Sequence, residues 1–338
     1  MQAAIIHAPF DMQLGFRQLP QPGPGEVRVS VRVAGICASD MYIYLGTNPY
    51  ANYPIVAGHE IAGVVDSVGN GVVDLEPGIR VVVEPFINCG SCFPCRSGRS
   101  NCCARLQIIG IHRAGGYAEH LIAPAKNIHR VLDGMSFATA SFAEPVAIAV
   151  HACRRGNVST GQYVLILGCG PIGLALIEVA KARGARVVAT DVLHSRLEIA
   201  SRLGAEVVQA DDEMVSTILD QTHGEGAPVV IEATGTVKAI EQTVSLVAAA
   251  GRIVIVGLVK EGAIVGFPGL DLTRKEMTIV GSRASVNCFP ESLELLDGGA
   301  ITYPRVATEF KMWEAPQVFA RLAEDPQFVH KGLLVLEE

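Results

Sequence analysis

Short runs of alternating apolar and polar residues dominate the first 148 residues of the chain. Four of them are EVRVSVRVAG, EIAGVVDSVG, GIRVVVEP and GGYAEHLIAP, which are rich in β-branched residues and punctuated by glycine and proline. A period of two is typical of half-buried strands, and glycine and proline favour the turns between them. The pattern predicts a β-rich, barrel-like or sandwich-like unit with few helices.

From about Tyr163 the pattern changes to short apolar strands separated by segments of helix length. The expected strands are YVLILG, ARVVATD, EVVQA, VVIEATG, RIVIVGL and MTIVGSR. Helices are expected up to Arg183 and around Leu193 to Leu203. Six strands alternating with helices predict a doubly wound parallel sheet over residues 149–288.

After about Cys288 this alternation ends. A helix in PESLELLDGG, a short strand near Phe310, a helix in EAPQVFARLAE and a final strand in GLLVLEE are expected. We expect residues 289–338 to return to the first domain. The predicted fold is thus α/β, with one domain from 1–148 and 289–338 and a second over 149–288.

A glycine-rich turn follows the first strand of the second domain. In GCGPIG, Gly168 permits the tight turn, Gly170 lets the backbone approach a pyrophosphate, and Gly173 allows close packing of helix and strand. Asp191 ends the next strand, where a carboxylate suits the two ribose hydroxyls of NAD and repels the extra phosphate of NADP. Arg196 follows five residues later and either softens this preference or lies on the helix face.

Composition and charge narrow the possible partners and compartments. The chain has 338 residues, 49% of them hydrophobic and 18% charged, with a formal net charge of -7. An acidic, well-cored chain of this size predicts about two globular domains and no nucleic-acid or anionic-membrane partner. The N-terminus lacks the features of a signal peptide, and the longest apolar run is short for a membrane span. We therefore expect a cytoplasmic protein whose thiols stay reduced.

Five of the nine cysteines lie in NCGSCFPCRSGRSNCC, which admits a disulfide, a reactive thiol or a metal site. A reducing compartment favours metal or chemistry over disulfides. Cys89, Cys92, Cys95 and Cys103 have the spacing C-x2-C-x2-C-x7-C. Four thiolates on one loop close a tetrahedron around zinc, which describes a structural site. Cys102 competes for the fourth position at this stage.

Further candidate ligands are dispersed over three motifs. These are GICASD, with Cys37, Ser39 and Asp40; GHEIAG, with His59 and Glu60; and FAEPVAIAVHA, with Glu144. Taken singly, they read as a buried thiol, a core histidine and ordinary acids. Together with the four-cysteine lobe and the glycine-rich turn, in this order, they resemble the medium-chain, zinc-dependent alcohol and polyol dehydrogenases over essentially the whole chain. EPVAIAVHACRRG is especially similar to sorbitol dehydrogenase.

The resemblance implies a GroES-like catalytic domain, a Rossmann domain and an active site in the cleft between them. It also implies NAD and two Zn²⁺ per subunit, one catalytic and one structural, in a homotetramer or homodimer. Cys37 and His59 would bind the catalytic zinc with a carboxylate. We rank Glu60 first for that ligand, with Glu144 as an alternate or water-linked ligand.

The same resemblance assigns further roles. Ser39 would accept the substrate proton while zinc acidifies the alcohol. Tyr42 stands where relatives often continue the proton relay with a histidine, which leaves Tyr44 or water for that step. The expected cofactor residues are Gly168, Gly170, Pro171, Ile172, Gly173, Asp191, Arg196, Thr234, Gly257 and Ser282.

Segments around His112 and Arg283 bear on the substrate. SGRSNCCARLQIIGIHRAGGYAEHL and DLTRKEMTIVGSRAS are similar to bacterial hexonate dehydrogenases that oxidise L-galactonate or L-gulonate at C5. Arg283 would hold the carboxylate by two parallel hydrogen bonds, with His112, Arg113 and Tyr44 nearby; alternatively Arg283 contacts the cofactor or a neutral polyol. His151 is interpreted as a core histidine.

These residues predict oxidation of a secondary alcohol of a small-molecule sugar acid, L-gulonate or L-galactonate. Neutral polyols such as sorbitol or galactitol, and then L-threonine, are the alternatives. A redox sensor that only binds nucleotide could lose its catalytic ligands freely, and here Cys37, Ser39, His59, Glu60 and Glu144 are all present.

Overall fold

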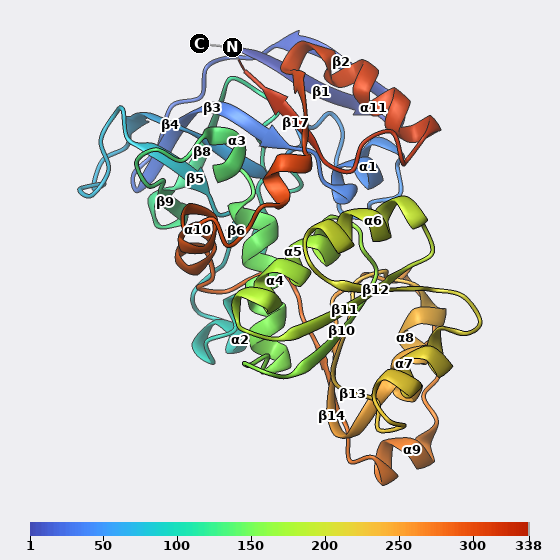
Figure 1. The fold of residues 1–338 in the computed structure, drawn as a ribbon. Coiled ribbons are helices and arrows are strands. Elements are labelled where there is room, and N and C mark those ends of the chain that lie inside the picture. The colour runs from blue at the N-terminus through green and yellow to red at the C-terminus, as the bar shows by residue number, and fades with distance from the viewer. Residues whose placement is uncertain (337–338) are drawn as a thin grey trace. The chain divides into compact units, whose positions relative to one another are not determined.

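The computed structural model describes residues 1–336, which form two compact units (Figure 1). The first unit comprises Met1–Glu144, Ser292–Asp297 and the chain from Pro304 onward; the second comprises Pro145–Glu291 and Gly298–Tyr303. The last forty residues or so thus mostly join the N-terminal part, while the short return of Gly298–Tyr303 to the second unit was not expected. No helix within residues 1–336 is both long enough and apolar enough to span a membrane.

A seven-stranded sheet forms the centre of the first unit, in the order β16-β17-β3-β4-β5-β9, with β8 also pairing with β3. Its strands are β3 (Glu26–Gly35), β4 (Glu60–Val68), β5 (Arg80–Val83), β8 (His120–Pro124), β9 (Ile128–Arg130), β16 (Thr308–Lys311) and β17 (Gly332–Val335). Along β3, Val27, Val29, Val31 and Val33 are buried and alternate with half-buried polar residues, as the period of two predicts. Because β17 pairs with β3, the C-terminus completes a sheet that the N-terminal part begins.

Smaller elements surround this sheet. They are β1 (Gln2–Ala8), β2 (Asp11–Phe16), β6 (Phe86–Ile87), β7 (Gln107–Ile108), α1 (Ala38–Tyr44), α2 (Phe93–Arg96), α3 (Phe137–Ala140) and α11 (Ala315–Glu324). Helix α11 inserts Phe319 into the core, where its ring lies edge-on to Tyr44 at 5.6 Å and to Tyr117 at 5.7 Å. This packing ties the C-terminal helix to the first unit.

The second unit contains the predicted six-stranded parallel sheet, in the order β12-β11-β10-β13-β14-β15. The strands are β10 (Tyr163–Leu167), β11 (Arg186–Asp191), β12 (Glu206–Gln209), β13 (Ala227–Glu232), β14 (Val247–Ile255) and β15 (Thr278–Gly281). The helices are α4 (Ala143–Gly156), α5 (Pro171–Ala182), α6 (His194–Arg202), α7 (Met214–Gln221), α8 (Val237–Leu246), α9 (Gly269–Arg274) and α10 (Phe289–Asp297). Two of them cross the boundary between the units: the first two residues of α4 and the last six residues of α10 belong to the first unit.

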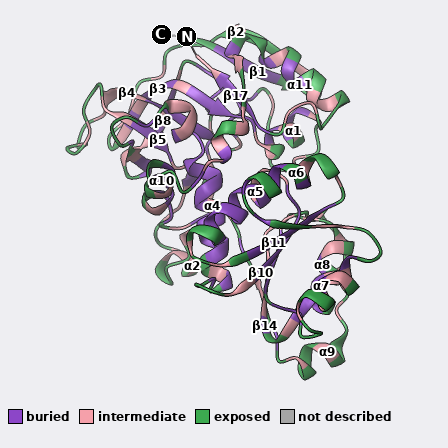
Figure 2. Cartoon of the chain, viewed as in Figure 1, coloured by how far each residue is buried: buried purple, intermediate pink, exposed green. Residues whose placement is uncertain are grey.

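The central strands of this sheet and helix α4 carry much of the unit's buried surface (Figure 2). Val164, Leu165 and Ile166 of β10 are fully buried, as expected for a strand covered on both faces. The strand order reverses between the neighbouring strands β10 and β13, and open α/β sheets bind ligands at the carboxyl ends of the strands at such a reversal.

Candidate active site and structural metal site

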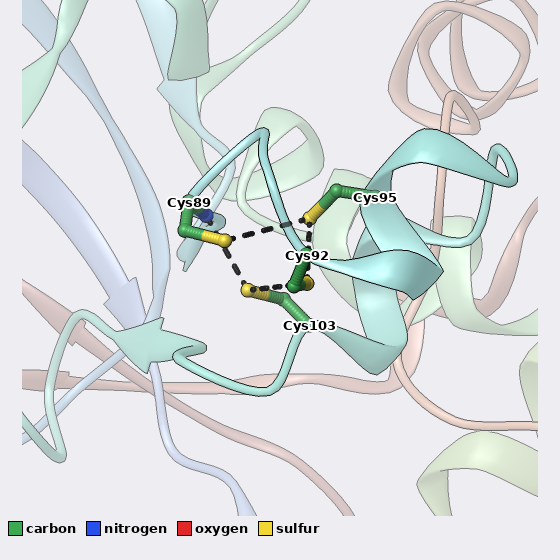
Figure 3. Close-up of side chains that lie close together, drawn as sticks. All are labelled: Cys89, Cys92, Cys95 and Cys103. Carbon is green, nitrogen blue, oxygen red and sulfur yellow. Dashed lines mark hydrogen bonds between the residues drawn. The ribbon is translucent and has the colours of Figure 1, made fainter.

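The four-cysteine lobe brings its sulfur atoms together around a common centre (Figure 3). The Sγ atoms of Cys92 and Cys95 lie 3.4 Å apart, those of Cys92 and Cys103 3.8 Å, and those of Cys89 and Cys95 4.0 Å. A tetrahedron with Zn–S bonds of about 2.3 Å requires S···S distances of about 3.8 Å. The spacing therefore fits a four-coordinate zinc site. All nine cysteines are free thiols, and Cys103, rather than the exposed Cys102, belongs to this group.

Hydrogen bonds and burial shift the pKa values of two of these thiols in opposite directions. The backbone N–H groups of Ser91 and Cys92 lower the pKa of Cys89 to about 4. Loss of solvation, together with the neighbouring Cys92 sulfur, raises the pKa of Cys95 to about 12. Four adjacent thiolates repel one another, so a bound dication is what would hold all four in the ionised form.

A second group of ligand atoms lies at one end of the β3–β4 pair. The Cys37 thiol, a ring nitrogen of His59 and a carboxylate oxygen of Glu60 lie within 4.8 Å of one another. Glu60 starts β4 directly opposite Gly35 of β3, and Cys37 follows two residues after that glycine. A Cβ atom at Gly35 would lie 2.0 Å from Glu60 Oε2, so a glycine here leaves room for the carboxylate. One thiol, one imidazole and one carboxylate are a donor set that zinc accepts, and three protein ligands leave a fourth position open.

Asp40 supports this group from behind. Its side chain is fully buried and accepts hydrogen bonds from Cys37 N at 2.9 Å, Gly58 N at 3.2 Å and the Tyr117 hydroxyl at 2.7 Å. Asp40 Oδ1 also lies 3.3 Å from Nδ1 of His59. Burial acts to raise the pKa of Asp40, yet His59 and the hydrogen bonds outweigh it, so the pKa is lowered.

The opposite nitrogen of His59 is left for a metal. Nε2 lies 3.5 Å from the Ser39 hydroxyl. With Nδ1 turned to the Asp40 carboxylate, we assign the proton to Nδ1 and the free lone pair to Nε2, which is the usual arrangement of a metal-binding histidine backed by a carboxylate. Sequence reasoning placed Asp40 in a motif but gave it no role; its position three residues after Cys37 was the available signal.

Lys331 is a second residue that sequence reasoning missed. It is 2% exposed and its ammonium donates hydrogen bonds to the Glu60 carboxylate and, at 3.0 Å, to the carbonyl of Ile36. Burial acts to lower the pKa of Lys331, but Glu60 and Cys37 outweigh it and the pKa is raised. Only the pairing of β17 with β3 brings this residue, 271 positions away in the chain, to Glu60.

Glu144 lies in the first turn of α4 and is 3% exposed. Burial is the main cause that raises the pKa of Glu144 to about 7; Glu60 also raises it, while His59 opposes the shift. Its carboxylate is outside the set of ligand atoms within 4.8 Å, which contains Glu60. The thiol of Cys37 and the carboxyl group of Glu60, with Asp40 beside His59 and Lys331 beside Glu60, form a group whose donors suit a divalent cation.

Three other candidate residues of the first unit are engaged with their own surroundings. His112 Nδ1 accepts a hydrogen bond from Ile108 N at 3.1 Å, and Arg113 donates to Glu26 at 2.8 Å. Tyr44 is 5% exposed, and its hydroxyl donates to the Phe10 carbonyl at 3.3 Å. Tyr44 is thus a core residue of the first unit.

In the second unit, the glycine-rich turn has the geometry that its motif predicts. Gly168 has a φ of +100°, and a Cβ at Gly173 would lie 1.8 Å from the Gly168 carbonyl oxygen. Gly170 caps the N-terminus of α5, and Pro171 occupies its first turn, followed by Ile172. The first amides of α5 therefore have the arrangement that suits an anion.

Asp191 is tied to this turn directly. Its Oδ2 accepts a hydrogen bond from Cys169 N at 2.8 Å, and its Oδ1 accepts one from Leu193 N at 2.9 Å. Arg196 lies on α6 with a guanidinium nitrogen 3.7 Å from Asp191 Oδ2. The carboxylate thus faces the glycine-rich loop, and Arg196 partly balances its charge.

The loops after β13 and β14 meet beside this turn. Glu232 is fully buried and accepts hydrogen bonds from Thr234 N at 2.6 Å and Gly235 N at 2.9 Å. A Cβ at Gly257 would lie 2.1 Å from Gly235 N, and one at Gly168 would lie 2.8 Å from Thr234 Cγ2. The structure therefore brings together three of the expected cofactor residues, and Glu232, an acid ending a buried strand, is an organiser that sequence reasoning missed.

The remaining candidates lie further along the second unit. Ser282 is 8% exposed and its N–H donates to Ile255 O at 2.8 Å, while the next residue, Arg283, is exposed. His151 is buried within α4, in line with its interpretation as a core histidine.

A dinucleotide-binding turn and an open Cys–His–Glu ligand group in one chain are the features of a metal-dependent dehydrogenase. Residues 23–133 match the alcohol dehydrogenase GroES-like domain, and residues 171–298 match the zinc-binding dehydrogenase domain. The chain belongs to the zinc-dependent medium-chain alcohol dehydrogenase family.

Relatives and solved structures agree over the whole length. The chain is 34% identical to the starvation-sensing protein RspB of Escherichia coli K12 over 341 residues, covering 100% of both proteins. It is 36% identical to L-galactonate-5-dehydrogenase of the same organism over 311 residues, 91% of each. The crystal structure of RspB from E. coli CFT073 with NADH matches with a TM-score of 0.93 and 33% identity, covering 99% of each chain.

Family membership settles the class of reaction. The chain is a zinc-binding oxidoreductase that acts on CH–OH groups with a nicotinamide cofactor. The predicted combination of a GroES-like domain and a Rossmann-like domain is confirmed. It is of the polyol and sugar-acid type within the family.

Proposed function

We propose that this enzyme oxidises the C5 hydroxyl of a hexonate, L-gulonate or L-galactonate, to a ketone with NAD. The observation that carries the proposal is Arg283, exposed on the loop that follows β15. A guanidinium there offers two parallel N–H donors to a carboxylate, a geometry that a lysine cannot supply. The relative named L-galactonate-5-dehydrogenase, 36% identical, supports the same substrate class.

Cys37, His59 and Glu60 would hold the catalytic zinc, with Glu144 as an alternate carboxylate. When bound there, zinc would act as a Lewis acid that lowers the pKa of the substrate hydroxyl. Ser39, 3.5 Å from His59 Nε2, is the group of this chain that would take the alcohol proton. Because the Tyr44 hydroxyl already donates to Phe10, we assign the onward transfer to water. Cys89, Cys92, Cys95 and Cys103 would hold the structural zinc.

Asp191 supports NAD rather than NADP as the cofactor. Its carboxylate is fixed by two backbone N–H groups at the glycine-rich turn, where it would accept from ribose hydroxyls and repel a phosphate. Arg196 weakens this repulsion without removing it, because its guanidinium is 3.7 Å away and partly exposed. We further propose that the enzyme is cytoplasmic and is a homotetramer or a homodimer. Light scattering on the purified enzyme would distinguish these two oligomeric states.

A neutral polyol such as sorbitol or galactitol is the second candidate substrate. It is favoured by EPVAIAVHACRRG, which is similar to sorbitol dehydrogenase. In that case Arg283 would donate to hydroxyl groups or to the cofactor, and the zinc chemistry would be unchanged.

The test is the initial rate of NADH formation with L-gulonate, L-galactonate, sorbitol, galactitol and L-threonine at equal concentration. We expect the acids to be faster by about a hundredfold, roughly 2.7 kcal/mol of transition-state discrimination. Arg283→Gln should abolish this advantage while leaving turnover of the neutral polyols. A neutral polyol as the best substrate would refute the proposal that Arg283 binds a substrate carboxylate. His59→Ala distinguishes an enzyme from a protein that only binds the nucleotide. The variant of an enzyme should lose turnover and still bind NAD.

A further inference from the structure

Two adjacent arginines at the end of α4, Arg154 and Arg155, reach the segment that follows β15. Arg155 Nε donates to the Gly281 carbonyl at 3.1 Å. One terminal nitrogen of Arg154 donates to the Asn287 carbonyl at 3.0 Å, and the other donates to the Glu291 carboxylate at 2.5 Å. The two guanidinium groups therefore hold both ends of residues 281–291.

A second layer of contacts keeps this arrangement in place. Arg183 donates to the other carboxylate oxygen of Glu291 at 2.6 Å, and the paired arginines lower the pKa of Glu291 against the effect of burial. Arg252 donates to the Arg155 carbonyl at 3.5 Å. All of these groups belong to the second unit. We call the contacts of Arg154 and Arg155 with residues 281–291 the brace, and it is complete within this unit.

The segment between the two anchors is one that would not keep its shape unaided. Ala284 has a φ of +48°, a conformation in which alanine is strained, and Asn287 has a φ of +52°, which asparagine adopts more readily. The hydroxyl oxygens of Ser282 and Ser285 are buried and lack a hydrogen-bond partner within residues 1–336. Backbone strain and unpaired buried hydroxyls both cost free energy, which the surrounding contacts must offset.

We propose that Arg154 and Arg155 are positioning residues that hold residues 281–288 in the conformation that presents Arg283 to the substrate. This inference rests on the proposed role of Arg283 and deepens it. The inference also assigns a role to the HACRRG motif, because both of its arginines donate hydrogen bonds to backbone carbonyls of one loop. Neither arginine needs to touch the substrate.

The experiment compares Arg154→Ala and Arg155→Ala with Arg186→Ala in the full-length enzyme. Arg186 makes an exposed bidentate ion pair with Glu206 in the same unit, at 2.7 and 2.8 Å, so it is a matched loss of a surface arginine. Arg155→Lys is the conservative variant, because one ammonium can still reach the Gly281 carbonyl.

Two readouts are taken. Hydrogen exchange of the peptide over residues 281–288, in enzyme without substrate, reports on the amide of Ser282, which donates to Ile255 at 2.8 Å. We expect exchange there to accelerate about tenfold in both alanine variants, and the KM of whichever substrate the wild type oxidises fastest to rise about tenfold. Arg186→Ala should change neither, and Arg155→Lys should restore most of both.

Unchanged exchange over 281–288, or faster exchange without any change in KM, would overturn the inference. If an alanine variant fails to fold, Glu291→Gln removes one anchor and leaves the Arg154 contact with Asn287; it should show a smaller change of the same kind, and no change would count against the brace. The exchange readout needs no substrate. Failure of the sugar-acid proposal would therefore appear in the substrate comparison and would leave the exchange result intact.

Discussion

Replacing Asp40 by asparagine tests the reasoning about the metal group most directly. The substitution keeps the shape of a fully buried side chain and removes its charge. In the native protein, Oδ2 accepts from Cys37 N and the Tyr117 hydroxyl, while Oδ1 accepts from Gly58 N and faces His59 Nδ1. An amide has only one oxygen, so in either orientation its NH₂ group opposes a backbone N–H.

The magnitude follows from two separate losses. One buried N–H without an acceptor costs about 1–3 kcal/mol of folding free energy. Loss of the carboxylate behind His59 should weaken zinc binding by about 10–100-fold, the range seen for partners of metal-binding histidines. The native pKa of Asp40 is lowered, so its contribution to stability is present above the unfolded pKa, near 4, and is lost as the pH falls through the lower folded value.

The assay is competition with a chromogenic chelator, in which we expect two zinc ions per subunit to be released with different affinities. Asp40→Asn should weaken one of them and leave the other, held by the four cysteines, unchanged. Tyr117→Phe removes only one of the hydrogen bonds to Asp40 and should have a smaller effect. Asp211→Asn, at an exposed helix-entry carboxylate, is the control. Equal zinc retention in Asp40→Asn and the control would refute the assigned role of Asp40.

Three further predictions follow from the same contacts. Cys92→Ser should lose zinc and thermal stability together, because a four-sulfur site has no spare ligand; retention of two zinc ions with loss of turnover alone would contradict the structural role of this site. Lys331→Met leaves the Glu60 carboxylate buried without its cation and should lower stability by about 3–5 kcal/mol, measured as a fall in the melting temperature of the first unit; an unchanged melting temperature would show that the pair contributes nothing. Asp191→Ala should raise the Kd for NAD and improve the ratio of NADP to NAD turnover by about tenfold, roughly 1.4 kcal/mol, in parallel kinetic assays; an unchanged ratio would remove Asp191 from cofactor selection.

The sequence pattern was sufficient for the fold and for sites built from contiguous residues. The six strands of the parallel sheet, the glycine-rich turn and the four-cysteine spacing are short-range features, because each depends on residues that lie close together along the chain. Where candidate ligands are dispersed, as with Cys37, His59 and Glu60, single motifs were ambiguous, and the family resemblance was needed to group them.

Other features depend on long-range pairing that no local pattern encodes. Lys331 meets Glu60 because β17 pairs with β3, and Asp40 meets His59 because β3 and β4 are neighbours. Local pattern also could not show where the side chain of Tyr44 lies. This candidate residue near the Ser39 motif packs in the core against Phe319, which is far away in the chain.

By itself, then, the sequence determined the fold class, the nucleotide-binding turn and the four-cysteine group, because spacing and periodicity carry that information, and its motifs carried the resemblance to the family. The tertiary structure alone decided which buried charges lie beside the candidate catalytic ligands and which arginines contact the loop of Arg283. Such contacts join residues far apart in the chain, and their energetics depend on burial and orientation, which exist only once the strands have paired and the cores have packed.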